Sequence, residues 1–145
     1  MISIKAIELS DLEEYAALCD ELFGSITNRV ELEKMVKKIA ANPDYLLVGI
    51  IDEKKQLLGS VMGIMCIDTV GECRPFMVIE NLVVSKKNRR QGVGKKLVSY
   101  IEECARERNC YFVMLMSLAK RTEAHMFYES IGYSKHIAQG FKKYL

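Results

Sequence analysis

The sequence is poor in the features that mark several classes of protein. Its five cysteines are odd in number and none are spaced as C-x-x-C, which argues against a disulfide framework and against a structural zinc site. No apolar stretch approaches the roughly 20 residues that a membrane-spanning helix needs, and the first residues lack the long apolar region of a secretory signal. We therefore expect no metal, no membrane partner and a reducing, cytoplasmic location.

An excess of charge of one sign is also missing. The 21 basic residues nearly balance the 19 acidic ones, and the formal net charge is only +2. Proteins that bind nucleic acid through general positive charge are typically far more basic, so we expect no nucleic-acid partner. The 145 residues have an ordinary globular composition with no repeat and no low-complexity linker, which predicts a single domain over residues 1–145.

Hydrophobic periodicity predicts an α/β fold. The expected strands cover residues 2–7, 45–51, 57–67, 76–84 and 111–116, and the expected helices cover residues 12–23, 30–41, 93–108 and 122–131. Thr122 is expected to cap the last helix, and residues 134–145 are expected to add two short strands. The order β-α-α-β-β-β-α-β-α-β predicts a mixed, twisted central sheet flanked by helices.

The most informative segment is the polar loop between strand 76–84 and helix 93–108. Gly92 and Gly94 leave room for an anion near the first amides of the helix, which have no partner inside the helix and carry the positive end of its dipole. Six of the 21 basic residues surround this loop: Lys86, Lys87, Arg89, Arg90, Lys95 and Lys96. The segment does not fit the P-loop pattern, nor G-x-G-x-x-G, since Leu97 stands where the third glycine would be. A polyphosphate site and a solvated turn both stay open on these residues alone.

Two blocks of the sequence resemble the GCN5-related N-acetyltransferase (GNAT) family. Residues 89–94 match the family's [Q/R]-x-x-G-x-[G/A] motif, and residues 124–133 resemble its A-x-x-F-Y-x-x-x-G-[F/Y] helix. The resemblance implies a GNAT-like fold over nearly the whole chain and acetyl-CoA as the acetyl-donor cosubstrate. It also implies that the loop and the helix start bind the pyrophosphate of the coenzyme, through Arg89, Arg90, Gln91, Gly92, Val93, Gly94 and Lys95.

The same resemblance implies how strand 76–84 serves the coenzyme. In the family this strand splays from the next one and leaves backbone groups free for the pantetheine arm, which assigns coenzyme contacts to Leu82, Val83 and Val84. The Leu82 amide is then a candidate donor to the oxyanion. Arg121 stands where many members have an asparagine that contacts pantetheine, and we expect Arg121 to meet a coenzyme phosphate instead.

Acetyl transfer to an amine needs a base and a proton for the leaving thiolate, because an alkylammonium with a pKa near 10 must first lose its proton. Glu80, in the middle of an apolar strand, is the candidate base, acting through a water, and a structural carboxylate is the alternative. Tyr128 matches the family tyrosine near the coenzyme sulfur and is the candidate proton donor, with core packing as the alternative. His125, one turn earlier, is a lesser candidate for the base or for a coenzyme contact.

These assignments predict an acetyl-CoA-dependent N-acetyltransferase that transfers the acetyl group directly to a primary amine. A small-molecule amine is the preferred acceptor. The resemblance to the family implies that residues 27–38 and the loop 68–74 border it, and Asp68 and Glu72 in that loop could attract a cation. A lysine or N-terminal amine of a protein is the alternative within the same class. A non-catalytic module that binds acyl-CoA is the alternative from another class, and a homodimer is left open.

Overall fold

The computed structural model describes all 145 residues and contains one five-stranded sheet. The strands lie in the order β1-β2-β3-β4-β5. Neighbouring strands from β1 to β4 are antiparallel, whereas β5 runs parallel to β4. The strands are β1 Ser3–Ala6, β2 Tyr45–Ile51, β3 Leu57–Cys66, β4 Phe76–Val84 and β5 Val113–Leu115. The prediction of a mixed α/β sheet is therefore confirmed.

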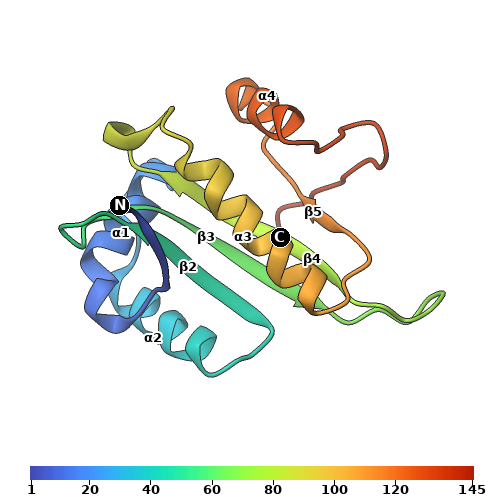
Figure 1. Ribbon diagram of the computed structural model, residues 1–145, viewed down its shortest axis with the longest axis horizontal. Coiled ribbons are helices and arrows are strands. Elements are labelled where there is room, and N and C mark those ends of the chain that lie inside the picture. The colour runs from blue at the N-terminus through green and yellow to red at the C-terminus, as the bar shows by residue number, and fades with distance from the viewer.

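Four α-helices flank the sheet, and two short 3-10 turns precede the first and third of them. The helices are α1 Leu12–Phe23, α2 Arg29–Ala40, α3 Val93–Glu107 and α4 Thr122–Ser130, and the turns are Leu9–Asp11 and Lys86–Asn88. Helix α3 crosses the sheet, and α4 lies beyond the β4 edge, near the N-terminal half of α3 (Figure 1). Each helix on the N-terminal side has a local signal: the Asn28 side chain accepts a hydrogen bond from the Glu31 amide at the start of α2, and Gly24 ends α1 with a φ of +86°.

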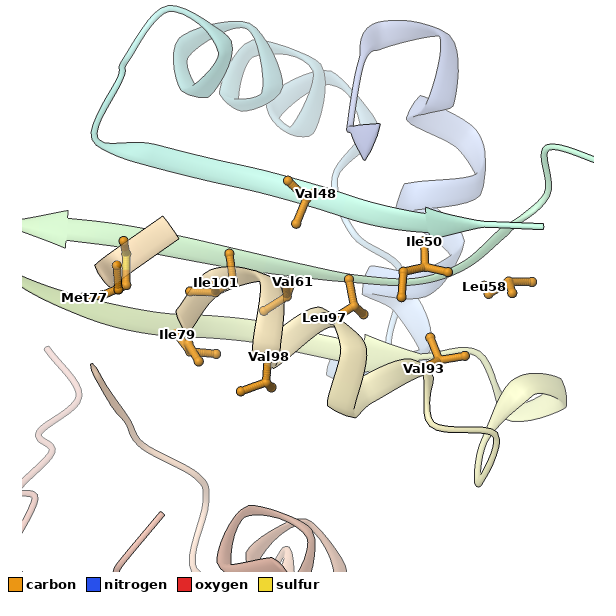
Figure 2. Close-up of a cluster of buried hydrophobic side chains, with 11 residues drawn as sticks. Val48, Ile50, Leu58, Val61, Met77, Ile79, Val93, Leu97, Val98 and Ile101 are labelled. Atoms are coloured by element: carbon orange, nitrogen blue, oxygen red, sulfur yellow. The ribbon is translucent and has the colours of Figure 1, made fainter. Parts of the chain in front are cut away.

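The two faces of the sheet carry separate hydrophobic cores. Under α3, eleven buried side chains pack together, and five of them come from that helix (Figure 2). These five are Val93, Leu97, Val98, Ile101 and Ala105, which recur at helical spacing. On the other face, α1 and α2 pack on the sheet through Tyr15, Leu18 and Val36. The sheet is thereby held rigidly between layers, and β4 reaches the site described below from within this core.

Strand β4 carries a bulge that changes which way its side chains point. Two β4 residues, Asn81 and Leu82, lie opposite the single β3 residue Val61, and Asn81 has a left-handed φ of +53°. The extra residue reverses the alternation along the strand. Ile79, before the bulge, packs under α3, whereas Val83, after it, packs on the side of α1 and α2.

The C-terminal segment differs from the prediction. Residues 134–145 form no strand, so the predicted order is reproduced without its last element. The segment returns past the end of β5, where Gly140 lies against Met116, and both Ile137 and Phe141 are 87% exposed (Figure 1). A strand needs a neighbour with which to exchange backbone hydrogen bonds, and no element lies beside this segment in that way.

The start of α4 also corrects the sequence prediction. Arg121, rather than Thr122, is the residue that precedes the helix, and no side chain caps its first amides. Two strand ends are shorter than the apolar runs that predicted them: β3 ends at Cys66, and β5 covers only three residues. None of the helices combines the length and the apolar character that crossing a membrane requires.

Candidate active site

A gap opens between β4 and β5. The two strands pair only over Met77–Ile79 and Val113–Leu115, whereas β4 continues to Val84. From Glu80 onward, β4 therefore has no strand on its β5 side, and the bulge at Asn81 bends this part of it further. The backbone of β4 is therefore free there to bind a ligand that carries amide groups. This agrees with the splayed strands that the resemblance to the family implied.

The loop that follows β4 is fastened from several directions. The side-chain amide of Asn88 donates a hydrogen bond to Ser85 Oγ at 2.7 Å. The Lys86 amide donates to a carboxylate oxygen of Glu21 in α1 at 3.2 Å, which ties the loop to the opposite layer. Glu21 belongs to no recognisable motif, so the sequence gives no signal for this contact. The loop then reaches Gly92, whose φ of +77° favours glycine because a side chain is strained in this region.

The first amides of α3 are open to a ligand. The first hydrogen bond of the helix runs from the Lys96 amide to the Gly92 carbonyl at 3.1 Å, and no side chain caps the helix. The amides of Val93, Gly94 and Lys95 consequently have no partner within the helix. A Cβ added at Gly92 would meet nothing within 4 Å, so no other part of the chain packs against this side of the residue before the helix. Such an arrangement suits an anion, and pyrophosphate in particular.

Positive charge surrounds the same amides. The Arg89, Arg90, Gln91 and Lys95 side chains are all exposed. The Arg89 guanidinium donates through Nε to the Val84 carbonyl at 3.2 Å, which directs that side chain back along β4. Val93, in contrast, is only 3% exposed, so it can reach a ligand only through its backbone.

Gly94 allows α3 and α4 to approach each other closely. A Cβ at this position would lie 3.3 Å from Phe127 Cζ in α4 and 3.6 Å from Val84 Cγ2 in β4. A larger residue would therefore push α4 away from the end of β4. Phe127 packs against the core beneath α3, so its ring anchors α4 beside the gap.

Tyr128 lies next to that anchor and is half-buried. Burial raises the pKa of its hydroxyl above the ordinary tyrosine value. The positive charge of Arg121 acts against this rise in pKa, and the negative charge of Glu80 adds to it. Glu80, from β4, and Arg121, the residue before α4, are therefore each close enough to Tyr128 for their charges to act on its hydroxyl. The structure thus brings together both predicted catalytic residues and Arg121, which lie up to 48 positions apart in the sequence.

Other predicted residues occupy different environments. Leu82 and Val84 are half-buried and pack against the core beneath α3, whereas Val83 is 5% exposed and belongs to the opposite core. Only the backbone of Val83 can therefore face a ligand. The His125 ring lies 2.9 Å through Nε2 from the Leu118 carbonyl, which fastens the connection between β5 and α4. This bond gives His125 a local structural role.

An ion pair that the sequence did not predict stiffens the connection between α1 and α2. Asp20 accepts hydrogen bonds from Arg29 Nη1 and Nη2, at 2.9 and 2.8 Å, and from the Thr27 amide at 2.7 Å. The Arg29 guanidinium, followed by the Thr27 amide, holds the pKa of the Asp20 carboxyl well below its usual range. The clamped segment presents Phe23 and Ile26, which are 79% and 84% exposed, as an apolar surface.

A cavity of about 370 Å³ lies near the N-terminal end of β4. Asp68, Glu72 and Arg74 line it together with the aromatic residues Tyr111 and Phe112. The sequence predicted the two carboxylates here but assigned the two aromatic residues to a strand. About 13 Å of strand separates the start of β4 from Glu80, by the usual rise per residue. An acceptor that reaches from Glu80 into this cavity would meet carboxylates and aromatic rings.

No group of three or more His, Cys, Asp and Glu side chains is placed to hold a metal ion. All five cysteines have free thiols. The chemical groups that the site offers are thus backbone amides, cations, a carboxylate and a phenol.

Comparison with known proteins agrees with this geometry. The sequence profile described as "Acetyltransferase (GNAT) family" matches residues 10–133. A glucosamine 6-phosphate N-acetyltransferase from Arabidopsis thaliana is 26% identical over 141 residues, which cover 94% of this chain and 92% of that protein. A solved GNAT family acetyltransferase from Staphylococcus aureus is 28% identical, with a TM-score of 0.80 and coverage of 99% and 98% of the two chains.

A third similar structure was solved with a coenzyme derivative. It is AAC(6')-Iy in complex with the bisubstrate analogue CoA-S-monomethyl-acetylneamine, with a TM-score of 0.84, 15% identity and coverage of 100% of this chain and 99% of that one. At this identity the likeness shows the fold alone. The family profile, however, spans most of the chain, including the loop before α3 and the helix that carries Tyr128. The chain therefore belongs to the GNAT family of acetyltransferases, enzymes that use acetyl-CoA as the acetyl donor.

Proposed function

We propose that this acetyltransferase transfers the acetyl group from acetyl-CoA directly to a primary amine of a small molecule. The observation that carries the proposal is the gap between β4 and β5, which has free amides of α3 at one end and Glu80 and Tyr128 beside it. Acetyl-CoA supplies an activated acetyl group as a thioester. The residues of this chain bind and orient acetyl-CoA, accept a proton from the acceptor amine and donate a hydrogen bond to the leaving thiolate.

The coenzyme is held mainly by backbone. The amides of Val93, Gly94 and Lys95 bind the pyrophosphate, with the cations of Arg89, Arg90 and Lys95 and the amide of Gln91 around it. Backbone groups of Leu82, Val83 and Val84 bind the pantetheine arm along the free edge of β4. Arg121, exposed at the start of α4, contributes a further positive charge toward a phosphate. The bulge leaves the Leu82 amide as the donor for the oxyanion.

Glu80 is the base in this proposal. Its side chain is half-buried beside the bulge and forms no hydrogen bond or ion pair within the chain, so the carboxylate is free to accept a proton. A water that bridges Glu80 and the acceptor nitrogen would carry that proton. The carboxylate lies within electrostatic reach of Tyr128, which brings both ends of the reaction to one place.

Tyr128 serves the leaving thiolate as a hydrogen-bond donor. The raised pKa keeps its hydroxyl protonated at neutral pH, so that the donor is always present. Burial makes the Tyr128 hydroxyl a weaker acid than an ordinary tyrosine, whose pKa is about 10, so Tyr128 acts by donating a hydrogen bond rather than by giving up its proton. Stabilising the developing charge needs only the hydrogen bond.

The acceptor is inferred from the cavity at the start of β4. Its two carboxylates, Asp68 and Glu72, outnumber the one cation, Arg74, and so favour a cationic group. Arg74 already lies over the Tyr111 ring, and the aromatic walls favour a partner with an apolar body. The similar protein named as a glucosamine 6-phosphate N-acetyltransferase supports a small amine as the acceptor class. A lysine or N-terminal amine of a protein is the alternative acceptor.

The test measures the release of the coenzyme thiol from acetyl-CoA. We expect slow release from acetyl-CoA alone and faster release with members of a panel of small polyamines, amino sugars and aminoglycosides. If only lysine-containing peptides increased the rate of thiol release, the acceptor would be an amine of a protein rather than of a small molecule. Tight coenzyme binding without stimulation by either set would indicate a binding module rather than a transferase acting on these amines.

The homodimer and the cytoplasmic location remain predictions from the sequence. Exposed apolar residues in the C-terminal segment and at β5 would suit a second copy, among them Phe112, Met116, Ile137 and Phe141. Light scattering of the whole chain measures the first prediction directly.

A further inference from the structure

The C-terminal segment, residues 134–145, has backbone groups that the chain itself does not use. No hydrogen bond between backbone groups involves a residue after Tyr133. The segment makes only two local bonds, from the His136 amide to Ser134 Oγ and from Gln139 Nε2 to the Gly140 carbonyl. None of its twelve residues is proline, so each has an amide donor and a carbonyl acceptor. Most of these groups are therefore available to another strand.

Strand β5 has a free edge that could receive such a segment. It is the last strand of the sheet, so its outer side has no strand partner (Figure 1). Val113 and Leu115 pack against the core beneath α3, which turns Met114 and Met116 to the other side of the sheet, where they are 40% and 49% exposed. Residues 111–118 include no charged residue and no proline. Sheet edges in monomers are usually protected by lysines, prolines, bulges or a covering element.

Within one chain, the segment crosses the end of β5 instead of lying along its edge. A Cβ at Gly140 would lie 2.9 Å from Met116 Sδ, yet no backbone hydrogen bond forms there. Ile137 and Phe141 are both exposed and lie four positions apart, so they share one face of any strand that contains them. They could then pack beside Met114 and Met116, which also share one face.

We propose that residues 137–141 of one copy add a strand to the free edge of β5 in a second copy, which returns the same contact. Each chain carries both the segment and the edge, so a two-fold axis makes the exchange reciprocal. Because β5 is also the strand across the gap from β4, the added strand would hold that side of the gap in place. The proposal depends neither on the position of the coenzyme nor on the acceptor.

The apolar area agrees with a stable dimer. Phe141 and Tyr144 are 87% and 79% exposed in a single chain. An aromatic side chain buries about 150–250 Å², so these two rings from both copies would bury about 600–1,000 Å². Ile137, Met114 and Met116 and the paired backbone extend this area toward the range of about 1,200–2,000 Å² that stable interfaces bury.

Light scattering over a range of protein concentrations is the first test. We expect the wild type to have the mass of two chains and Phe141→Asp to have the mass of one, because the variant places a charge in the apolar contact. The Phe141 side chain is exposed in the single chain, so the variant should keep its fold. Circular dichroism checks that it does.

A pair of proline variants tests the backbone pairing itself. The amides of adjacent residues point to opposite edges of a strand, so only one of Ala138→Pro and Gln139→Pro removes a hydrogen bond to β5. We expect that variant to raise the dissociation constant of the dimer about tenfold and the other to change it little. Each variant is thus the matched control for the other, and neither removes a backbone hydrogen bond within the chain.

Amide hydrogen exchange distinguishes the second copy from the chain's own edge. We expect residues 137–141 to be protected only at concentrations at which the dimer forms. Protection at every concentration, with the mass of one chain, would mean that the segment pairs with β5 of its own chain and would overturn the proposal. A wild type that stays monomeric without protection would also overturn it, as would a dimer that persists unchanged in Phe141→Asp and in both proline variants.

Discussion

At the scale of single residues, Tyr128 illustrates how position selects one role among several. A phenol on the inner face of a helix is ordinarily a packing residue, and the neighbouring Phe127 performs that role here. Tyr128 is half-buried and lies near both a carboxylate and a guanidinium. Its ring contacts those of Phe127 and Tyr133 edge-on, at centroid distances of 5.4 and 6.3 Å, so the hydroxyl is held by a fixed ring.

Tyr128→Phe removes the hydroxyl and keeps those ring contacts. We expect kcat to fall by about 10²-fold, the lower end of what one hydrogen-bond donor to a developing negative charge contributes. Coenzyme affinity and melting temperature should change little, since neither depends on the hydroxyl. Steady-state kinetics with the best amine of the panel measures the first, and calorimetry and thermal melts measure the others. If the variant kept full activity, Tyr128 would have only a packing role, and a water molecule would donate the hydrogen bond to the leaving thiolate.

Glu80→Gln tests the base and keeps the shape of the side chain. The amide can still hydrogen-bond to a water, but it cannot accept a proton at neutral pH. We expect kcat/KM to fall about 10²-fold or more at pH 7 and to recover in part at high pH, where more of the free amine is already neutral. The pH profile of kcat/KM, recorded for both proteins with the same amine, is the measurement.

The control for this variant is its affinity for coenzyme A, which should match that of the wild type because the coenzyme meets the backbone of β4. Wild-type activity of Glu80→Gln at pH 7 would remove the carboxylate from the mechanism. A variant that no longer folds would instead favour the structural alternative, in which Glu80 supports the strand beside the bulge.

At the scale of elements, the loop before α3 binds through its shape as much as through its charge. Gly92 needs its left-handed conformation and faces open space, so alanine at this position costs about 1 kcal/mol of backbone strain, and aspartate, whose short side chain tolerates this region better, costs no more. Only aspartate adds a negative charge beside the free amides. Gly92→Ala is therefore a matched control for Gly92→Asp.

We expect Gly92→Asp to weaken coenzyme binding by more than tenfold relative to Gly92→Ala, because a carboxylate at this place repels phosphate. The difference between the two variants should narrow as salt is added, since screening weakens the repulsion. Calorimetry at low and high ionic strength measures both effects. If the two variants bound coenzyme A with equal affinity, the pyrophosphate would not bind at the start of α3.

The elements also show what the sequence could and could not predict. Periodic apolar residues predicted every α-helix and β1 to β4 nearly to the residue, because those elements bury one face each against a core. The bulge at Asn81 was invisible, since an apolar run does not reveal a left-handed residue in the middle of a strand. The length of β5 was overestimated, although its predicted first residues do bond to the β4 side: the Tyr111 amide donates to the Pro75 carbonyl at 2.8 Å and the Met77 amide donates to the Phe112 carbonyl at 3.0 Å. Regular strand pairing covers only Val113–Leu115.

The candidate site likewise contains residues that the sequence predicted and residues that it could not predict. The loop from Arg89 to Lys95 and the helix with Tyr128 have local signatures, and the resemblance located them. The Asp20–Arg29 pair and the hydrogen bond from Lys86 to Glu21 join residues from separate elements. Partners of this kind depend on how layers pack, which no local pattern encodes.

At the scale of the whole molecule, buried tyrosines tie stability to pH, and three of them lie in or beside the hydrophobic cores. Burial raises the pKa of Tyr15, in the core under α1, and that of Tyr128. Burial likewise raises the pKa of Tyr133, and the Glu102 carboxylate, which accepts its hydroxyl hydrogen bond at 3.0 Å, raises it further. In the unfolded chain all three should titrate near the ordinary tyrosine value of about 10.

The sign of the pH effect follows from proton counts. Above pH 10, the unfolded chain loses protons that the folded chain still holds, so the free energy of unfolding decreases as pH rises. Below pH 10 all three hydroxyls are protonated in both states and contribute no slope. We therefore expect thermal stability to be flat with respect to these groups up to about pH 9.5 and to fall steeply above it.

Tyr133→Phe separates this effect from general alkaline denaturation. The variant loses the hydrogen bond to Glu102, so it should be less stable at pH 7. It also loses one of the three groups whose protons favour the folded state at high pH, so its stability should fall less steeply between pH 10 and pH 11.5. Chemical denaturation at a series of pH values yields both the offset and the slope. Parallel curves for the variant and the wild type would show that Tyr133 titrates alike in the folded and unfolded chains, and the alkaline transition would then belong to other groups.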